Sequence, residues 1–516
     1  MCGITGWVGF GQDPTIRHDV LAAMTATLTP RGPASGGMWT SEHAALGHRG
    51  IGTATTQPMS AGHVTTTTDC EVLNFQELRA DLRGRGHRFS TDTDTEVVLR
   101  GYLEWGLGVA ERLNGTFAFA LWDARAQRLV LVRDRLGVKP LHYCPTPNGA
   151  VFGSEPKAVL AHPDIARKID ADGLRELFTL VRTPGHACWA GLREVRPGTV
   201  LTVDRSGVRE HVYWRLETEP HLDDADTTAK EVRRLLEDSL AHQFAPEVLP
   251  GGLGTSAITA LTGARTCAPT TAEPDLVALR EDVVRACDLP LGLGELTRLD
   301  LLRAVRQRVD VVLSGDGADE LFGGYPWYHH PVVQQARTFP WLVGAGAPFL
   351  HRDVREWLDL DTYAVDACAT AVREIARLPG EPDQAWRLRK MTYLHLTRFL
   401  RVLLDRTDRL AAAAGLRVRL PFADHRLVEY VYNAPQPFDG AERGLLHAAV
   451  SDRLPAWSEP PAEHGAVELP ADHPVFDLVD RAWLATAADD PATRRAVEQV
   501  LDLAVWLEVH RPEIVR

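Results

Sequence analysis

The chain begins Met1-Cys2-Gly3, which places a thiol directly after the initiator methionine. Because a methionine that precedes a small residue is normally removed, we expect Cys2 to become the first residue of the mature protein. Its thiol would then share one residue with a free α-amino group, whose pKa of about 7.7–8.0 suits it to deprotonate its own nucleophile. Position alone does not separate this role from that of an ordinary small residue, so the rest of the chain has to decide.

Length and composition indicate a large globular protein. The chain has 516 residues, of which 45% are hydrophobic and 24% charged, and two domains are the natural expectation. No apolar run approaches the ~18 residues of a membrane span, so we expect no membrane segment. The formal charge of −13 disfavours nucleic acid as a partner.

The cysteines favour neither a zinc site nor a disulfide framework. Their number is odd, at seven, and no C-x-x-C spacing occurs. Such scattered thiols are typical of a reducing compartment, so we expect the protein in the cytoplasm.

The first half of the chain has the pattern of a strand-rich domain. Residues 116–123 and 128–134 are apolar runs of strand length with a polar turn between them, and residues 200–203 predict another strand. An amphipathic helix with an acidic first turn is expected from Asp94 to Leu107.

From about residue 225 the pattern changes to helices with isolated buried strands. We expect helices over 227–244 and 386–414 and a buried strand over 309–313. The sequence therefore predicts a β-rich domain over residues 1–215 and an α/β domain over residues 216–516.

The ordered motifs of the chain resemble those of the glutamine-dependent asparagine synthetase family over nearly its whole length. The segments that carry the resemblance are Met1–Gly6, Arg31–Pro33, Gln57–Met59, Asn74–Arg79, Thr93–Val97, Leu113–Ala120, Val132–Leu141, Ser314–Tyr325 and Arg419–Arg426.

This resemblance implies a two-domain α/β protein. Its fold would be an N-terminal-nucleophile glutaminase domain of αββα type, followed by an α/β ATP-pyrophosphatase domain of the adenine nucleotide alpha hydrolase kind. The second domain is shortened between 257 and 310. The family hydrolyses glutamine on the residue matched by Cys2, and its second domain uses ATP to activate a carboxylate that the released ammonia then amidates.

In the glutaminase domain, the resemblance assigns substrate binding to Asp69, Cys70, Glu71 and Asp94. The family has an Asn-Gly pair at the first two positions, where it stabilises the oxyanion. Asp69 brings a carboxylate in place of an amide donor, while Cys70 keeps a backbone N–H. Losing one such donor typically costs ~10²–10³ in rate, so we expect glutamine hydrolysis to be impaired.

The family also binds the substrate carboxylate with an arginine, and this chain has Gly50 at the matching position. A shifted alignment would let Arg49 take this role. The residues leave both possibilities open.

In the second domain, the family's pyrophosphate loop is matched by a run that keeps Gly251, Gly252 and Ser256. The first serine of that loop is Pro250 here, which removes a hydroxyl and a backbone N–H. The metal-binding aspartate is Gly254. Read from the residues alone, the run predicts an ordinary helix start with Thr255 or Ser256 as the N-cap.

A second acidic motif of the family is intact. The resemblance implies that Ser314 and Gly315 of this motif bind nucleotide, that Asp316 is catalytic and that Asp319 binds the metal. The alternative is that the segment is kept only as a folded strand, turn and helix. The family's catalytic lysine is matched by Arg443, which keeps the charge but not the ammonium geometry.

The interval before this motif is short. Residues 257–310 read largely as helices, over 274–286 and 296–308, and leave no room for the family's adenosine-contacting β–α units. A basic stretch of the family is replaced by the acidic run 458–463. These changes predict that ATP-dependent ligation is lost or altered.

Three functions are left open by the residues. The first is a glutamine-dependent amide ligase with ATP and Mg²⁺ as cofactors and with glutamine and a carboxylic acid as small-molecule substrates. The second is a Cys2-dependent amidohydrolase or acyl transferase that acts on another substrate, without ATP or any other cofactor. The third is a non-catalytic paralogue that binds a ligand or a partner enzyme; family members often form homodimers.

Overall fold

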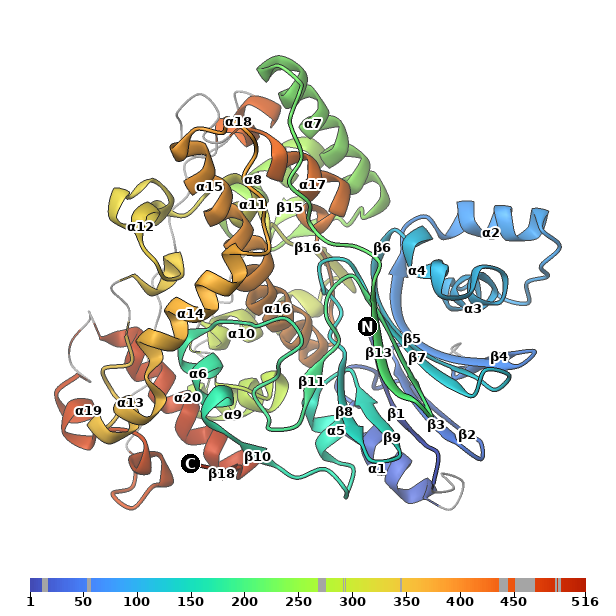
Figure 1. Cartoon of the computed structure of the whole chain (residues 1–516), viewed down its shortest axis with the longest axis horizontal. Helices are drawn as coiled ribbons and strands as arrows, with labels where there is room; N and C mark the ends of the chain where they lie inside the picture. The colour runs from blue at the N-terminus through green and yellow to red at the C-terminus, as the bar shows by residue number, and fades with distance from the viewer. Residues whose placement is uncertain are drawn as a thin grey trace. The chain divides into compact units, whose positions relative to one another are not determined.

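The structure is a computed structural model that describes residues 1–11, 17–52, 57–267, 275–290, 292, 294–343, 346–435, 444–450, 469–487, 490 and 493–516. It divides into two compact units (Figure 1). Unit 1 consists of Met1–Lys168, Pro184–Arg215 and Ala412–Gly415, and unit 2 of Ile169–Thr183, Leu216–Ala411 and Leu416–Arg516. The domain boundary at residues 215 and 216 stays a prediction.

Unit 1 is built on two antiparallel sheets of six described strands each. Sheet A has the order β11 (Arg193–Glu194), β8 (His142–Thr146), β9 (Gly149–Gly153), β1 (Cys2–Gly9), β3 (Ala44–Gly50), β2 (Ser35–Thr40). Sheet B has the order β13 (Gly207–Val212), β12 (Thr199–Asp204), β7 (Arg128–Arg133), β6 (Gly115–Asp123), β5 (Val64–Val72), β4 (Met59–Ala61).

The sheets pack face to face, and helices cover both outer faces. Strand β6 shows why, because successive side chains of a strand point to opposite sides. Its residues Ala118, Ala120 and Trp122 belong to the core between the sheets. Phe117 and Phe119 face the helices instead. The predicted strands over 116–123 and 128–134 are confirmed as β6 and β7.

The helices of unit 1 complete an αββα arrangement. Helices α2 (Phe75–Gly84) and α3 (Asp94–Trp105) pack on sheet B, and α1 (His18–Thr27) and α5 (Pro156–Leu160) pack on sheet A (Figure 1). Between α3 and β6 lies α4 (Val109–Arg112). The predicted helix over 94–107 ends at Trp105 and continues as a short 3₁₀ turn.

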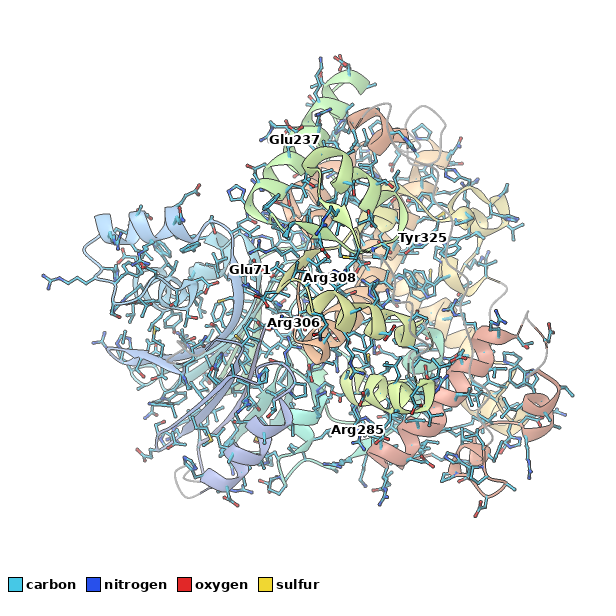
Figure 2. All side chains as sticks on the ribbon, turned by 180° about the vertical axis from the view of Figure 1, so that it is seen from behind. Glu71, Glu237, Arg285, Arg306, Arg308 and Tyr325 are labelled. Carbon is cyan, nitrogen blue, oxygen red and sulfur yellow. The ribbon has the colours of Figure 1, made fainter. Side chains whose placement is uncertain are left out.

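Unit 2 contains a small parallel sheet within a helical unit. Its described strands have the order β15 (Arg265–Thr266), β14 (Glu247–Val248), β16 (Val311–Leu313), β17 (Arg417–Arg419). The buried carboxylate of Glu247 on β14 binds Arg308 over 3.2 Å. Figure 2 labels Arg308, which lies just before β16 in the chain. The buried strand expected over 309–313 is thus confirmed, though it is shorter than predicted.

Helices make up most of unit 2. They are α6 (Ala171–Thr179), α7 (Ala225–His242), α8 (Gly252–Thr262), α9 (Leu276–Cys287), α10 (Glu295–Arg306), α11 (Ala318–Phe322), α12 (Pro331–Gln335), α13 (Arg352–Leu358), α14 (Leu360–Val372), α15 (Asp383–Leu394), α17 (His425–Asn433), α18 (Gly444–Val450), α19 (Arg481–Ala487) and α20 (Arg494–His510). The helical stretch predicted over 386–414 is confirmed as α15, a π-helical turn at His395–Phe399, and α16 (Leu400–Ala414).

The predicted cap of α8 is wrong. The helix begins at Gly252 with Gly251 as the N-cap, and that cap makes no side-chain hydrogen bond. Thr255 lies within the helix, and its hydroxyl donates to the Leu249 carbonyl over 2.8 Å. Positive φ angles of 139° and 57° at the two glycines allow the early start, which a side chain would strain.

In the part of the chain that is described, no helix combines the length and apolarity needed to cross a membrane.

Candidate active site

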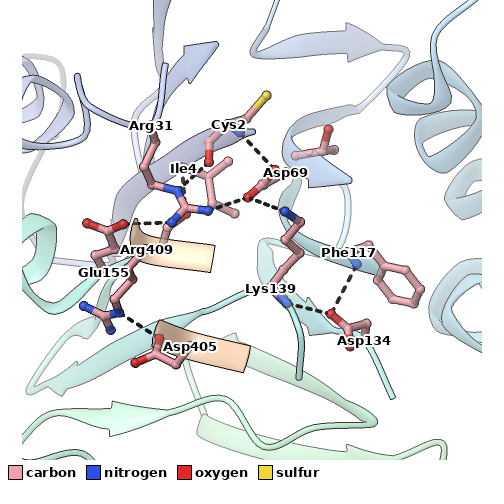
Figure 3. Close-up of polar contacts among 12 residues, drawn as sticks. Cys2, Ile4, Arg31, Asp69, Phe117, Asp134, Lys139, Glu155, Asp405 and Arg409 are labelled. Atoms are coloured by element: carbon pink, nitrogen blue, oxygen red, sulfur yellow. Dashed lines mark hydrogen bonds and ion pairs between the residues drawn. The ribbon is translucent and has the colours of Figure 1, made fainter. Parts of the chain in front are cut away.

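Cys2 begins β1, and buried side chains hold both of its main-chain polar groups. Its N–H donates to Asp69 Oδ1 over 3.0 Å, and its carbonyl oxygen accepts from Arg31 Nε over 2.7 Å. Arg31 also donates to Asp69 Oδ2 over 2.9 Å, which closes a ring of contacts around the Cys2 main chain (Figure 3). The side chains of this ion pair are only 1% and 4% exposed, so the nucleophile's backbone is held without competition from water.

Further charges surround the Arg31–Asp69 pair. Glu155 Oε1 lies 2.8 Å from Arg31 Nη1, and Lys157 Nζ lies 2.7 Å from the other oxygen of Glu155. On the far side of Asp69, Lys139 Nζ lies 3.9 Å from Oδ2. The nucleophile therefore stands on a buried network in which each carboxylate has at least one cationic partner.

Electrostatics make the Cys2 thiol a weak acid in this structure. Its pKa is raised to about 11, first by burial and then by the charge of Asp69. The terminal amine, Lys139 and Arg31 act in the opposite direction. Burial lowers the pKa of the α-amine, which is that of Met1 here, while Asp69 raises it.

The residues predicted to bind substrate lie together next to Cys2. Asp69, Cys70 and Glu71 are consecutive on β5, and Asp94 begins α3. Asp94 accepts the N–H of Val72 over 3.3 Å, which ties the start of α3 to the end of β5. Burial raises the pKa of the Asp94 carboxyl, and Glu71 adds to this effect. This end of sheet B thus presents a run of acidic groups.

Arg49 does not join them. It pairs with Gly3 across β1 and β3, one residue from Cys2, so the strand alternation puts its side chain on the other face of sheet A. Ile4, on the same face as Cys2, belongs to the core between the sheets. The Arg49 guanidinium instead donates to the Pro33 carbonyl over 3.4 Å. The structure therefore does not bring Arg49 to the Cys2 thiol.

In unit 2, the two predicted nucleotide loops lie against each other. One joins β14 to α8 and the other joins β16 to α11, and these strands are parallel neighbours, so their carboxyl ends share an edge. A Cβ at Gly252 would lie 3.2 Å from Asp319 Oδ2, and one at Gly315 would lie 2.6 Å from the Thr255 nitrogen. Ser256, in the second turn of α8, contacts its own helix through the Gly252 carbonyl over 3.5 Å.

Asp316 is bound by an arginine of the same unit. Its Oδ2 accepts from Arg298 Nη2 over 2.6 Å and from Thr407 Oγ1 over 2.8 Å, while its N–H donates to Ser314 Oγ over 3.3 Å. Burial raises the pKa of Asp316, but Arg298 and Arg406 outweigh burial and hold it below the ordinary value. Asp316 is therefore an ionised carboxylate with an internal cation.

Glu320 is a buried acid beside this pair. It accepts from the hydroxyl of Tyr325, which Figure 2 labels. The pKa of Glu320 is raised to about 7, first by burial and then by Asp319. Among the described residues, no group of three or more His, Cys, Asp or Glu side chains is arranged to hold a metal ion.

Comparison with known proteins matches both halves of the chain. Residues 1–214 match a family described as glutamine amidotransferase domain, and residues 256–504 one described as asparagine synthase. Glutamine-hydrolysing asparagine synthetase 3 of Bacillus subtilis is 36% identical, over 88% of this chain and 85% of its own length. The chain belongs to the asparagine synthetase family.

Other members and neighbours are more distant. Asparagine synthetase 1 of Bacillus subtilis is 27% identical over 88% of this chain and 85% of its own length. An amidase of Gibberella zeae is 26% identical over 63% of this chain and 59% of its own length. Among solved structures, glutamine phosphoribosylpyrophosphate amidotransferase of Bacillus subtilis covers 62% of this chain and 77% of its own, with 18% identity and a TM-score of 0.32.

The sequence of this asparagine synthetase family member did not predict the site contacts of several residues, and one predicted site residue is not described by the structure. Arg443 is outside the described residues. Arg31 and Lys139 occur in segments that match the family, but nothing in their spacing indicated that they would surround Cys2. Arg298 is 18 positions from Asp316, and only the packing of α10 reveals their pairing.

Proposed function

We propose that this protein is a Cys2-dependent amidohydrolase that hydrolyses the γ-carboxamide of glutamine. The observation that supports it best is the Cys2 thiol at the start of β1, with its main chain held by Asp69 and Arg31. The thiol gives up its proton and attacks the γ-carbonyl carbon; the carbon–nitrogen bond then breaks, ammonia leaves with that proton, and a thioester forms. Water then hydrolyses the thioester to glutamate and returns the proton to the thiol.

The neighbouring residues take the roles that this reaction requires. Glu71 and Asp94 supply negative charge for the α-ammonium group of the substrate. The backbone N–H of Cys70 donates to the developing oxyanion. Asp69 accepts hydrogen bonds on both oxygens and offers no donor, so we expect a rate lower by about 10²–10³ than with a second donor present.

The ATP and Mg²⁺ that the family implies fit poorly in unit 2. Gly254 carries no carboxylate, and a Cβ there would lie 2.5 Å from the Gly315 carbonyl oxygen, so no larger residue fits without a backbone shift. The carboxylate of Asp316 is already paired with Arg298. The described part of 257–310 holds the end of α8, the two-residue strand β15, α9 and α10. ATP-dependent ligation is, in this proposal, lost.

The acyl acceptor is then water, which makes the protein a Cys2-dependent amidohydrolase. The named amidase among its relatives is in keeping with such an activity.

Formation of glutamate from glutamine tests the proposal. We expect activity in the wild type, none in Cys2→Ala, and unchanged activity in the control Cys144→Ala, whose buried thiol lies on β8. Absence of glutamate in the wild type would favour a non-catalytic paralogue. Release of AMP with aspartate and ATP, lost in Asp316→Asn, would show that ligation is retained.

A further inference from the structure

We infer that Asp69 positions the main-chain nitrogen of Cys2, and that its negative charge confines the reactivity of this nucleophile to alkaline pH. The inference rests on the proposed function, because it concerns the nucleophile of that reaction. It assigns to Asp69 a role that differs from oxyanion stabilisation.

The geometry makes Asp69 an acceptor only. Its Oδ1 takes the Cys2 N–H and its Oδ2 takes Arg31, with Lys139 3.9 Å from the same oxygen. The Asp69 side chain is 4% exposed. Asp69 lies on sheet B, and its carboxylate contacts Cys2 at the start of β1 in sheet A. Arg31 also donates to the Cys2 carbonyl oxygen, so the Arg31–Asp69 ion pair binds the main-chain groups on both sides of the Cys2 Cα.

Removal of Met1 would convert the Cys2 N–H, which donates to Asp69, into the α-amino group of the mature chain. That amine would stand about 3 Å from a buried carboxylate, which favours its ammonium form. A protonated amine cannot take the proton of the thiol. The same carboxylate also disfavours the thiolate, so both effects of Asp69 move nucleophile activation toward higher pH.

Other charges nearby do not cancel this effect. Arg31 and Lys139 lower the pKa of the thiol, but less than burial and Asp69 raise it. His48 on β3 pairs with Ile4 and so lies on the same face of sheet A as Cys2. Burial lowers the pKa of His48 to about 4, and its side chain is neutral at pH 7. The carboxylates of Glu71 and Asp94 add negative charge from β5 and α3, and Glu155 is paired with Arg31 and Lys157.

Alkylation of Cys2 by iodoacetamide, measured between about pH 6 and pH 12, tests the inference without glutamine. Trypsin releases residues up to Arg17 in a peptide whose only cysteine is Cys2, so mass spectrometry follows this thiol alone. The same peptide reports whether Met1 is present. Because no substrate is used, failure of glutamine hydrolysis would overturn the proposed function and leave this inference standing.

Two variants with opposite expected shifts separate charge from structure. Asp69→Asn removes the negative charge, and we expect the midpoint of the rate–pH profile to fall by at least one unit, with about tenfold faster labelling below it. Lys139→Gln removes a nearby positive charge and should raise the midpoint. The control Asp123→Asn, a buried carboxylate at the end of β6, should leave it unchanged.

A midpoint shared by Asp69→Asn and the control would overturn the inference, as would an acid shift in Lys139→Gln. Thermal melting establishes that each variant is folded. Should Asp69→Asn fail to fold, the direction of the Lys139→Gln shift decides.

Discussion

Gly254, in the first turn of α8, lies against Gly315 in the loop after β16. A Cβ atom at position 254 would be 2.5 Å from the Gly315 carbonyl oxygen and 2.9 Å from the Ala318 Cβ. The two loops that the family uses for nucleotide binding are thus in direct contact, at a position where the resemblance leads one to expect an aspartate.

Gly254→Ala should therefore destabilise the protein. The added methyl group has no space, and overpacking of this kind costs about 1–3 kcal/mol in the free energy of unfolding. Urea denaturation measures it. Gly84→Ala is the control, since position 84 ends α2 and a Cβ there would have no atom within 4 Å; its stability should stay within about 1 kcal/mol of the wild type. Equal stability of the two variants would contradict the close packing.

Arg298 should be the cation on which Asp316 depends. Its loss in Arg298→Gln leaves a largely buried carboxylate without its nearest partner, which we expect to cost roughly 1–3 kcal/mol in the free energy of unfolding. Arg303→Gln is a matched control on the same helix, because Arg303 forms an exposed pair with Asp282 worth about 0–1 kcal/mol. Urea denaturation compares them. If both variants lose the same stability, Arg298 stabilises the Asp316 carboxylate no more than an exposed ion pair would.

ATP with Mg²⁺ should leave the melting temperature unchanged. A ligand that binds only the folded state adds about 2.7 kcal/mol at a hundredfold excess over its Kd, so binding would be visible. A glutamine-like electrophile such as diazo-oxo-norleucine probes the other site of the same preparation, and it should label the Cys2 peptide. A concentration-dependent rise with ATP and Mg²⁺ that Asp316→Asn abolishes would show that the centre still binds nucleotide.

The parts of the fold that were predictable are those set by local pattern. Residues 116–123 alternate between two apolar environments, and the strand β6 matches them to within one residue. The helix α7 (225–242) matches the helix predicted over 227–244 to within two residues at each end, because its apolar positions recur with helical spacing. The assignment of Asp69, Cys70, Glu71 and Asp94 to substrate binding came from the resemblance to the family and not from local pattern, and it stays a prediction; the structure adds that the first three lie on β5 and that Asp94 begins α3.

What escaped prediction depends on contacts between distant segments. The N-terminus of α8 was misplaced because two glycines with positive φ start the helix before any capping side chain. The side of the sheet on which Arg49 lies follows from the register of β1 with β3, which no short motif encodes. The hydrogen bond from Arg31 to the Cys2 carbonyl likewise joins residues 29 positions apart.

Glu320 should make stability fall as pH rises. Its folded pKa of about 7 lies above the value of about 4.3 for an unfolded glutamate, so between these values the folded protein binds more protons. The stability that this group contributes is complete below about pH 4.3 and is lost as pH rises through about 7. Glu320→Gln stays neutral and escapes this loss.

We therefore expect the free energy of unfolding of Glu320→Gln, relative to the wild type, to increase between about pH 5 and pH 8, by at most about 3 kcal/mol. Urea denaturation at several pH values measures the difference. Glu237→Gln, which removes an exposed partner of Arg233 on α7, should show no such trend. A Glu320→Gln profile parallel to that of the wild type would mean that Glu320 is already ionised at pH 5, and that Tyr325 and water solvate its charge in the folded protein.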